Sequence, residues 1–224
     1  MKITWIGQAG LMLEKEGFTV LIDPYLSNSI AKKDPKSERR TPINEELFNV
    51  KPDVIIFTHD HLDHYDAETA ERFIGKDTAL TVLAPTSVWR KVRMLGGSNN
   101  YVSFNAHTSV TVGNILFRAV RAEHSEEYAI GVIIDDGERK YYHTGDTLYN
   151  EDIFPDIPSD IYALFVPING VGNNMNTEDA ARFSERVGAR VTVPIHYGTF
   201  DSIDPNEFKC NNKRIIELYK ETEL

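Results

Sequence analysis

Short apolar runs separated by turn residues dominate the first half of the chain. Most are too short for helices and either alternate with polar residues or are continuously apolar, as strands do. They predict strands over residues 2–6, 11–14, 18–23, 53–58 and 79–84. Helical patterns over residues 66–74, ended by Gly75, and over residues 87–95 follow the last two strands.

The second half of the chain has a similar pattern. Apolar runs predict strands over residues 109–112, 115–120, 129–134, 140–144, 161–168 and 190–195. The segment Asp135-Asp136-Gly137 is a hairpin signal between the third and fourth of these strands. Asn176 is the expected N-cap of a helix that ends at Gly188. Its apolar face would hold Ala180, Phe183, Ser184 and Val187. We expect a last helix near residues 213–219.

The alternation of β-rich stretches with strand–helix units fits an α/β or α+β protein. The chain has 224 residues, which is enough for one domain of two or three layers, so we expect a single domain over residues 1–224. Hydrophobic residues make up 41% and charged residues 26% of the chain. These are ordinary values for globular proteins, so the disordered and fibrous classes are excluded.

Charge and cysteine content narrow the partners and the location. The formal net charge of −10 disfavours binding to a phosphate backbone, so we expect no nucleic acid partner. No apolar run approaches the roughly 20 residues that span a bilayer, and the N-terminus lacks the basic region of a signal peptide. Cys210 is the single cysteine, which suits a reducing compartment. We therefore expect a cytoplasmic protein with no membrane partner; the sequence leaves open whether it forms an oligomer.

The strongest chemical signal is the segment Thr58-His59-Asp60-His61-Leu62-Asp63-His64. Three of the 7 histidines of the chain fall here, directly after a predicted buried strand, where a rigid scaffold positions loop residues. Neutral imidazole and carboxylate groups are natural ligands of Zn²⁺ and other first-row divalent ions. A solvated histidine-rich loop is the alternative, which the preceding apolar strand disfavours. We therefore expect a metal site nucleated by His59, His61, Asp63 and His64.

This segment matches the HxHxDH signature of the metallo-β-lactamase superfamily, and the chain resembles that superfamily over nearly its whole length. Four further residues follow in the order, and at the strand ends, that the superfamily uses: Asp23 in LIDPYL, His124 in RAEHS, Asp146 in HTGDT and His196 in VPIHYG. The resemblance implies an αββα sandwich, with two mixed sheets packed face to face and flanked by helices. It also implies that Asp23 braces the metal loop.

The resemblance further implies a site for two divalent ions, zinc or manganese. One ion would be held by His59, His61 and His124, and the other by Asp63, His64 and His196, with Asp146 between them. A water shared by two cations becomes a hydroxide nucleophile near neutral pH, while the ions polarise the substrate. Asp63 and Asp146 are the expected catalytic carboxylates, and Asp63 is placed to orient the hydroxide and accept a proton.

Several other polar residues allow two interpretations. A lone histidine at a strand end is more often structural, and only the HxHxDH segment favours ligation by His124 and His196. His143 precedes the Gly-Asp turn and is more typical of a core or surface histidine than of a ligand's support, and His107 is expected to be structural or exposed. Asn174 and Asn176 either bind substrate or satisfy a loop and cap a helix.

A polar loop over residues 31–42 carries most of the local positive charge. Its basic residues are Lys32, Lys33, Lys36, Arg39 and Arg40. They either bind a substrate phosphate or form a solvated loop.

Some branches of the superfamily fit less well than others. Asp146 argues against the antibiotic-hydrolysing enzymes, which place cysteine at the equivalent point, and His61 argues against the di-iron oxygen reductases, which carry glutamate there. The segments Val166–Gly170, Asn174–Asn176 and VPIHYGTFD resemble the L-ascorbate-6-phosphate lactonase branch. Members of that branch are cytosolic, use a divalent ion such as manganese and open a sugar lactone.

These observations lead us to expect a metal-dependent hydrolase of a small, anionic ester or lactone. One alternative is a phosphodiesterase or nuclease-type metallohydrolase, which would have a basic groove near the metal. Another is a non-catalytic metal-binding protein, which we disfavour because no expected ligand is missing from the sequence.

Overall fold

Two mixed β-sheets form the centre of the computed structural model, which describes residues 1–75 and 77–224. Sheet A has the strand order β13-β1-β2-β3-β4-β5-β6, and sheet B has the order β12-β11-β10-β9-β8-β7. The strands of sheet A are β1 (Lys2–Gly7), β2 (Gly10–Lys15), β3 (Phe18–Ile22), β4 (Val54–Ile56), β5 (Thr81–Ala84), β6 (Asn100–Ser103) and β13 (Glu221–Glu223). Those of sheet B are β7 (Ser109–Val112), β8 (Ile115–Arg121), β9 (Ile130–Asp135), β10 (Lys140–His143), β11 (Ile161–Pro167) and β12 (Val191–Ile195).

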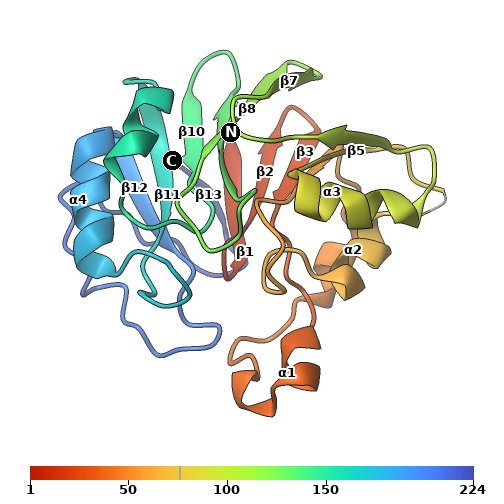
Figure 1. Cartoon of the computed structure of the whole chain (residues 1–224), viewed down its shortest axis with the longest axis horizontal. Helices are drawn as coiled ribbons and strands as arrows, with labels where there is room; N and C mark the ends of the chain where they lie inside the picture. The colour runs from red at the N-terminus through yellow and green to blue at the C-terminus, as the bar shows by residue number, and fades with distance from the viewer. Residues whose placement is uncertain (76) are drawn as a thin grey trace.

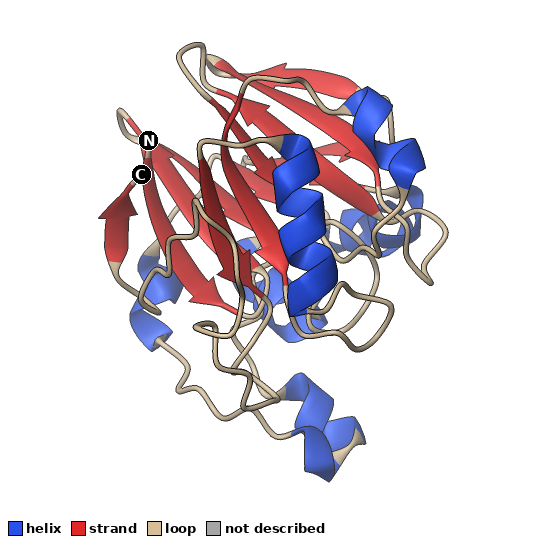
Figure 2. Cartoon of the chain, turned by 90° about the vertical axis from the view of Figure 1, so that its left-hand side faces the viewer, coloured by secondary structure: helices blue, strands red, loops and turns tan. Residues whose placement is uncertain are grey.

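Helices cover the outer faces of the two sheets (Figure 1). The helices α2 (Ala67–Phe73) and α3 (Thr86–Val92) lie against sheet A, and α4 (Thr177–Val187) lies against sheet B. Seen from the side in Figure 2, the two sheets face each other across a common core. The expected αββα sandwich of two mixed sheets is thus confirmed.

The alternation of side chains along each strand explains the two cores. Val54 and Ile56 of β4 pack in the larger cluster, which includes residues of both sheets and α4. Ile55 and Phe57 point the opposite way and pack in a second cluster with α2 and α3. Both faces of this strand are therefore covered, which is why its sequence is a continuous apolar run.

Local signals placed α4 correctly. The side chain of Asn176 accepts hydrogen bonds from the backbone N–H groups of Glu178 and Asp179, at 3.0 and 2.9 Å. Gly188 ends the helix with φ of +67°, a left-handed conformation that favours glycine. The four residues expected on its apolar face are all buried.

The predicted helix near residues 213–219 is wrong. This segment runs along the sheet edges instead, with isolated bridges from Lys213 to Thr192 and from Leu218 to Trp5. It leads into β13, which pairs with β1. Pairing with the open edge of sheet A satisfies the backbone groups of the tail and overrides its helical propensity.

Other elements carry too little apolar pattern to be seen in the sequence. They are β6, β13, the helix α1 (Ser29–Lys33) and the 3₁₀ helices η1 (Pro35–Ser37), η2 (Glu45–Asn49) and η4 (Glu151–Asp156), whereas the 3₁₀ helix η3 (Arg93–Leu95) falls within the helix predicted over residues 87–95. Of these, α1 has no buried residue and projects away from the sheets. Within residues 1–75 and 77–224, every helix is too short or too polar to cross a bilayer.

Candidate metal centre

Seven side chains from distant parts of the chain meet at one edge of the two sheets. They follow the carboxyl ends of strands: β4 leads into residues 59–64, β8 into His124, β10 into Asp146 and β12 into His196. Loops at the carboxyl ends of strands are where α/β proteins commonly bind ligands. The expected ligands are therefore brought together by the topology of the fold, not by the HxHxDH segment alone.

The first cluster consists of His59, His61, His124 and Asp146, whose potential ligand atoms all lie within 4.8 Å of one another. The closest approach joins His61 Nδ1 and His124 Nε2, at 3.1 Å. Ligands about 2.0–2.1 Å from a tetrahedral Zn²⁺ stand roughly 3.4 Å apart, so this spacing suits a shared ion.

The second cluster consists of Asp63, His64 and His196, again within 4.8 Å of one another. His64 Nε2 and His196 Nε2 lie 3.2 Å apart. Asp146 adjoins this cluster too, because its two carboxylate oxygens lie 3.2 Å from these same two nitrogens. Asp146 Oδ2 is also 3.9 Å from His59 Nε2 in the first cluster. Asp146 thus lies between the two clusters.

Unpartnered buried atoms support a pair of cations here. His59 Nε2 and Asp146 Oδ1 are buried and have no hydrogen-bond partner among the described residues. Leaving such groups unpaired is costly, whereas a divalent cation would satisfy both. The donor set of imidazoles and carboxylates also suits first-row divalent ions. The residues therefore fit two ions.

Asp23 fixes the orientation of the metal loop from behind. Its carboxylate accepts hydrogen bonds from Thr58 N–H at 2.7 Å, Thr58 Oγ1 at 2.5 Å and His64 Nδ1 at 2.7 Å. Because His64 donates to Asp23 through Nδ1, its Nε2, which faces the cluster, is the nitrogen that a cation would bind. Thr58 Oγ1 in turn can accept from His59 Nδ1, 3.1 Å away. Both imidazoles are thereby held in the tautomer that ligation requires.

Gln8 also belongs to the site, although no pattern in the sequence indicates it. Gln8 Nε2 donates to Asp63 Oδ2 at 2.8 Å and lies 3.2 Å from His196 Nδ1. The carbonyl oxygen of Gln8 accepts the backbone N–H of His196. The only signal in the sequence is the turn Gly7–Gly10, which follows the first strand and carries no chemistry of its own.

Two asparagines after β11 hold ligands from the other side. Asn174 Nδ2 donates to Asp146 Oδ2 at 2.7 Å, and Asn174 Oδ1 accepts from Thr147 N–H. The carbonyl oxygen of Asn173 accepts from His124 Nδ1 at 3.2 Å. Asn174 is therefore a support of Asp146, whereas Asn176 is a helix cap.

Backbone strain gathers around the site. Gln8, Asp23, Asn173 and His196 all have positive φ, between 42° and 62°. Such conformations cost non-glycine residues about 1–3 kcal/mol each and persist where surrounding structure enforces them. In these conformations the side chains or carbonyl groups of the four residues contact the clusters or belong to them.

The electrostatics of the second cluster reflect its crowded charges. Burial lowers the pKa of His196, but Asp146 and Asp63 outweigh it and raise that pKa to about 9. The pKa of His64 is likewise raised well above its usual range, against its burial, by Asp146, Asp63 and Asp23. In the first cluster, burial and the neighbouring His64 lower the pKa of His59. The metal-free second cluster thus holds protons that a cation would displace.

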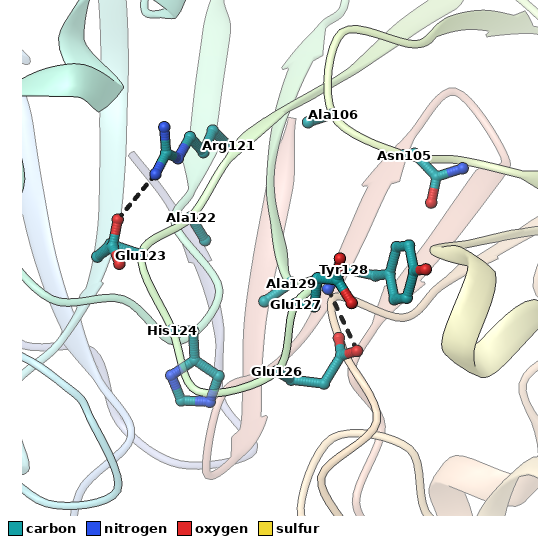
Figure 3. Close-up of a pocket in the computed structure, with 10 residues that line it drawn as sticks. All are labelled: Asn105, Ala106, Arg121, Ala122, Glu123, His124, Glu126, Glu127, Tyr128 and Ala129. Carbon is teal, nitrogen blue, oxygen red and sulfur yellow. Dashed lines mark hydrogen bonds and ion pairs between the residues drawn. The ribbon is translucent and has the colours of Figure 1, made fainter.

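Cavities adjoin the clusters on two sides. One, of about 230 Å³, is lined by the candidate ligands His61, Asp63, Asp146 and His196 and by Gln8, Asn169, Val171, Gly172, Asn174, Phe200 and Asp201. The other, of about 460 Å³, is lined by His124 and by neighbouring residues of the same loop (Figure 3). Arg121 lines this second cavity, but its guanidinium is paired with Glu123 at 3.1 Å.

The remaining residues singled out in the sequence have structural surroundings. His143 is fully buried, with Nε2 donating to Ala9 O at 2.8 Å and Nδ1 accepting from Gly145 N–H. His107 is exposed and lies 3.5 Å from Asp156. In the basic loop, Lys32 pairs with Glu68. Neither histidine joins the clusters.

Arg39 of the same loop is also committed. Its guanidinium donates to the carbonyl oxygens of Tyr25 and Ser27, at 2.9 and 3.0 Å, and lies over the Tyr25 ring. It therefore holds the loop to the body of the protein.

The fold and the paired histidine–carboxylate clusters define a class, that of two-sheet metallohydrolase-like proteins, and comparisons with known proteins agree. A family model described as a β-lactamase superfamily domain matches residues 19–197. A UPF0173 protein of Pyrococcus furiosus is 31% identical over 224 residues, covering 99% of this chain and 96% of the relative. A UPF0173 metal-dependent hydrolase of Methanopyrus kandleri is 31% identical, covering 100% of this chain and 95% of the relative. The chain belongs to the β-lactamase superfamily and, within it, to the UPF0173 metal-dependent hydrolase family.

A solved structure shows the same fold. Igni18, a metallo hydrolase from the archaeon Ignicoccus hospitalis, superposes with a TM-score of 0.78 at 23% identity. The match covers 99% of this chain and 97% of Igni18. At this level of identity the likeness concerns the fold alone.

Proposed function

We propose that this protein hydrolyses small esters or lactones with two divalent ions held by His59, His61, Asp63, His64, His124, Asp146 and His196. The observation that carries the proposal is the convergence of two clusters on Asp146, beside a cavity. Zinc or manganese bound there would supply Lewis acidity, which lowers the pKa of water and polarises a substrate carbonyl oxygen.

The side chains around the cavity have separable tasks. Asp63 is about 20% exposed and lines the cavity, whereas Asp146 is nearly buried between the clusters. Asp63 is therefore the carboxylate that orients an attacking water and accepts its proton, with Gln8 fixing its Oδ2. Asp146, held by Asn174, keeps the two clusters at a fixed separation.

A lactone is a cyclic ester, so lactone opening is the same class of reaction. We include lactones among the proposed substrates because segments of the chain resemble the ascorbate-6-phosphate lactonases. The structure supplies a scaffold role for two residues of that resemblance, since Asn174 supports Asp146 and Asn176 caps α4. A phosphodiesterase or nuclease would need a basic groove. Among the described residues, neither lysine nor arginine lines the 230 Å³ cavity, which favours the ester and lactone class.

Hydrolysis assays test the proposal directly. Purified protein supplied with Mn²⁺ or Zn²⁺ is screened against carboxylic esters, sugar lactones and phosphodiesters. We expect turnover of an ester or lactone that His61→Ala lowers by more than about 100-fold, since even residues that only support ligands cost up to that factor. His107→Ala, an exposed histidine outside the clusters, is the matched control. Full activity of the His61 variant would refute the site, and turnover of phosphodiesters alone would refute the substrate class.

A further inference from the structure

The cavity beside the second cluster has an unusual charge balance for a site expected to take an anion. Apart from the candidate ligands, its charged lining residue among those described is Asp201, whose Oδ1 accepts from Gly198 N–H and Ile203 N–H. Two divalent ions would bring four positive charges, of which Asp63 and Asp146 offset two. The ions would thus supply the positive charge of the cavity, because neither lysine nor arginine among the described residues lines it.

Two cations near the cavity, Arg39 and Lys91, are already engaged. The guanidinium of Arg39 is bound to the carbonyl oxygens of Tyr25 and Ser27 and lies over the Tyr25 ring, which is 5.8 Å from the ring of Phe200. Lys91, next to the metal loop, is paired with Asp60 at 2.6 Å. Freeing either cation for a substrate would leave its present partner without a counter-charge or a donor.

The lining residues that are not candidate ligands instead offer an acceptor and an apolar surface. Asn169 Nδ2 donates to the carbonyl oxygen of Val171 at 3.3 Å, while Asn169 Oδ1 is buried without a hydrogen-bond partner among the described residues. Val171 is 64% exposed and Phe200 half-buried, and both line the cavity. A substrate hydroxyl or amide N–H would satisfy Asn169 Oδ1, and an uncharged carbon skeleton would cover the apolar surface.

We propose that the substrate is uncharged away from the scissile bond and donates a hydrogen bond to Asn169. This inference rests on the proposed function of the same site and replaces the expectation of an anionic substrate. A second carboxylate or phosphate buried in this cavity would share it with Asp201 and with neither lysine nor arginine among the described lining residues, which is costly. The volume of about 230 Å³ limits the enclosed part of the substrate to a small skeleton.

Binding of metal-anchored probes separates this proposal from turnover. Three hydroxamic acids share one straight chain and end in a hydroxyl, an ammonium or a carboxylate group, and their dissociation constants are measured on zinc-loaded protein by calorimetry. We expect the hydroxyl-ended probe to bind at least tenfold more tightly than the carboxylate-ended one. Equal or tighter binding of the carboxylate-ended probe would overturn the inference while leaving the metal centre intact. If none of the three probes binds, the proposed metal-dependent function fails, and this inference fails with it.

Variants locate the effect within the cavity. Asn169→Ala should weaken the hydroxyl-ended probe several-fold and leave a methyl-ended analogue unchanged, whereas Asn114→Ala, on the β7–β8 turn, should change neither. Arg40 is exposed and its backbone N–H donates to Thr199 O beside the cavity. Loss of carboxylate-ended binding in Arg40→Ala would show that this side chain reaches an anionic substrate and would overturn the proposal. An unchanged affinity of Asn169→Ala for the hydroxyl-ended probe would also contradict it.

Discussion

Replacing Asp23 by asparagine tests how the fold selects the histidine tautomers. Asp23 is fully buried and accepts three hydrogen bonds, from Thr58 N–H, Thr58 Oγ1 and His64 Nδ1. An amide of the same shape offers one oxygen and one NH₂ group. At least one of the three groups that donate to Asp23 must therefore face the NH₂ group, which is itself a donor. If the NH₂ group faces His64, the imidazole accepts at Nδ1 and carries its proton on Nε2, where it cannot bind a cation.

The amide of the variant can take two orientations, and each weakens a different property of the protein. Losing the support of a ligating histidine lowers metal affinity by about 10–100-fold, or roughly 1.4–2.7 kcal/mol. Turning the NH₂ group toward Thr58 N–H instead leaves a buried donor unpaired, at about 1–3 kcal/mol of folding stability. Asp23→Asn should therefore bind the more weakly held of two zinc ions at least tenfold less tightly, or unfold at a lower urea concentration.

Metal affinity is measured by competition with a zinc chelator, together with elemental analysis of the dialysed protein and urea unfolding of the metal-free form. Asp53→Asn is the matched control, because Asp53 accepts a backbone hydrogen bond from Thr19 N–H at the opposite end of the same strands. Two tightly bound zinc ions and unchanged stability in Asp23→Asn would show that the tautomers are not set by this carboxylate.

Three further outcomes are expected. Gly145→Ala should lose about 1–3 kcal/mol of stability, because φ is +62° and the added Cβ would lie 2.5 Å from Ile130 O; urea unfolding measures this. The pKa of His196 is about 9, so this imidazole is protonated at pH 7.5 and zinc binding should release its proton. Zinc affinity should therefore fall as the pH drops below 9. Calorimetry in buffers of different ionisation enthalpy measures the proton release. Gln8→Ala should lower the affinity for the second ion about tenfold, because Asp63 loses its donor; elemental analysis counts the ions.

Each of these expectations has a contrary result. Unchanged stability of the Gly145 variant would mean that the turn relaxes without cost. Zinc affinity that is constant between pH 7 and 9 would show that His196 is already neutral in the metal-free protein. Retention of both ions by the Gln8 variant, with Gln8→Asn as the conservative comparison, would restrict Gln8 to a packing role.

The sequence alone determined the local chemistry of this protein. Residues 59–64 lie on a loop after a buried strand because the apolar run and the polar segment are adjacent in the chain. Asn176 and Gly188 bound α4 because caps act within one turn of a helix. The class of fold followed from the same motif. These features depend on neighbours a few residues away, which a sequence displays directly.

The tertiary structure decided everything that depends on distant segments. Gln8 meets Asp63 across 55 positions of the chain, and its turn has no chemical signature of its own. The tail after residue 213 extends along the sheet edges rather than forming a helix, because the edges offer backbone partners that a local pattern cannot show. The charge that lines the cavity also cannot be predicted from the sequence. In the sequence Arg39 is one basic residue of a polar loop, and only the structure shows that its guanidinium donates to the carbonyl oxygens of Tyr25 and Ser27. Long-range contacts set these partners, and composition and periodicity contain no record of them.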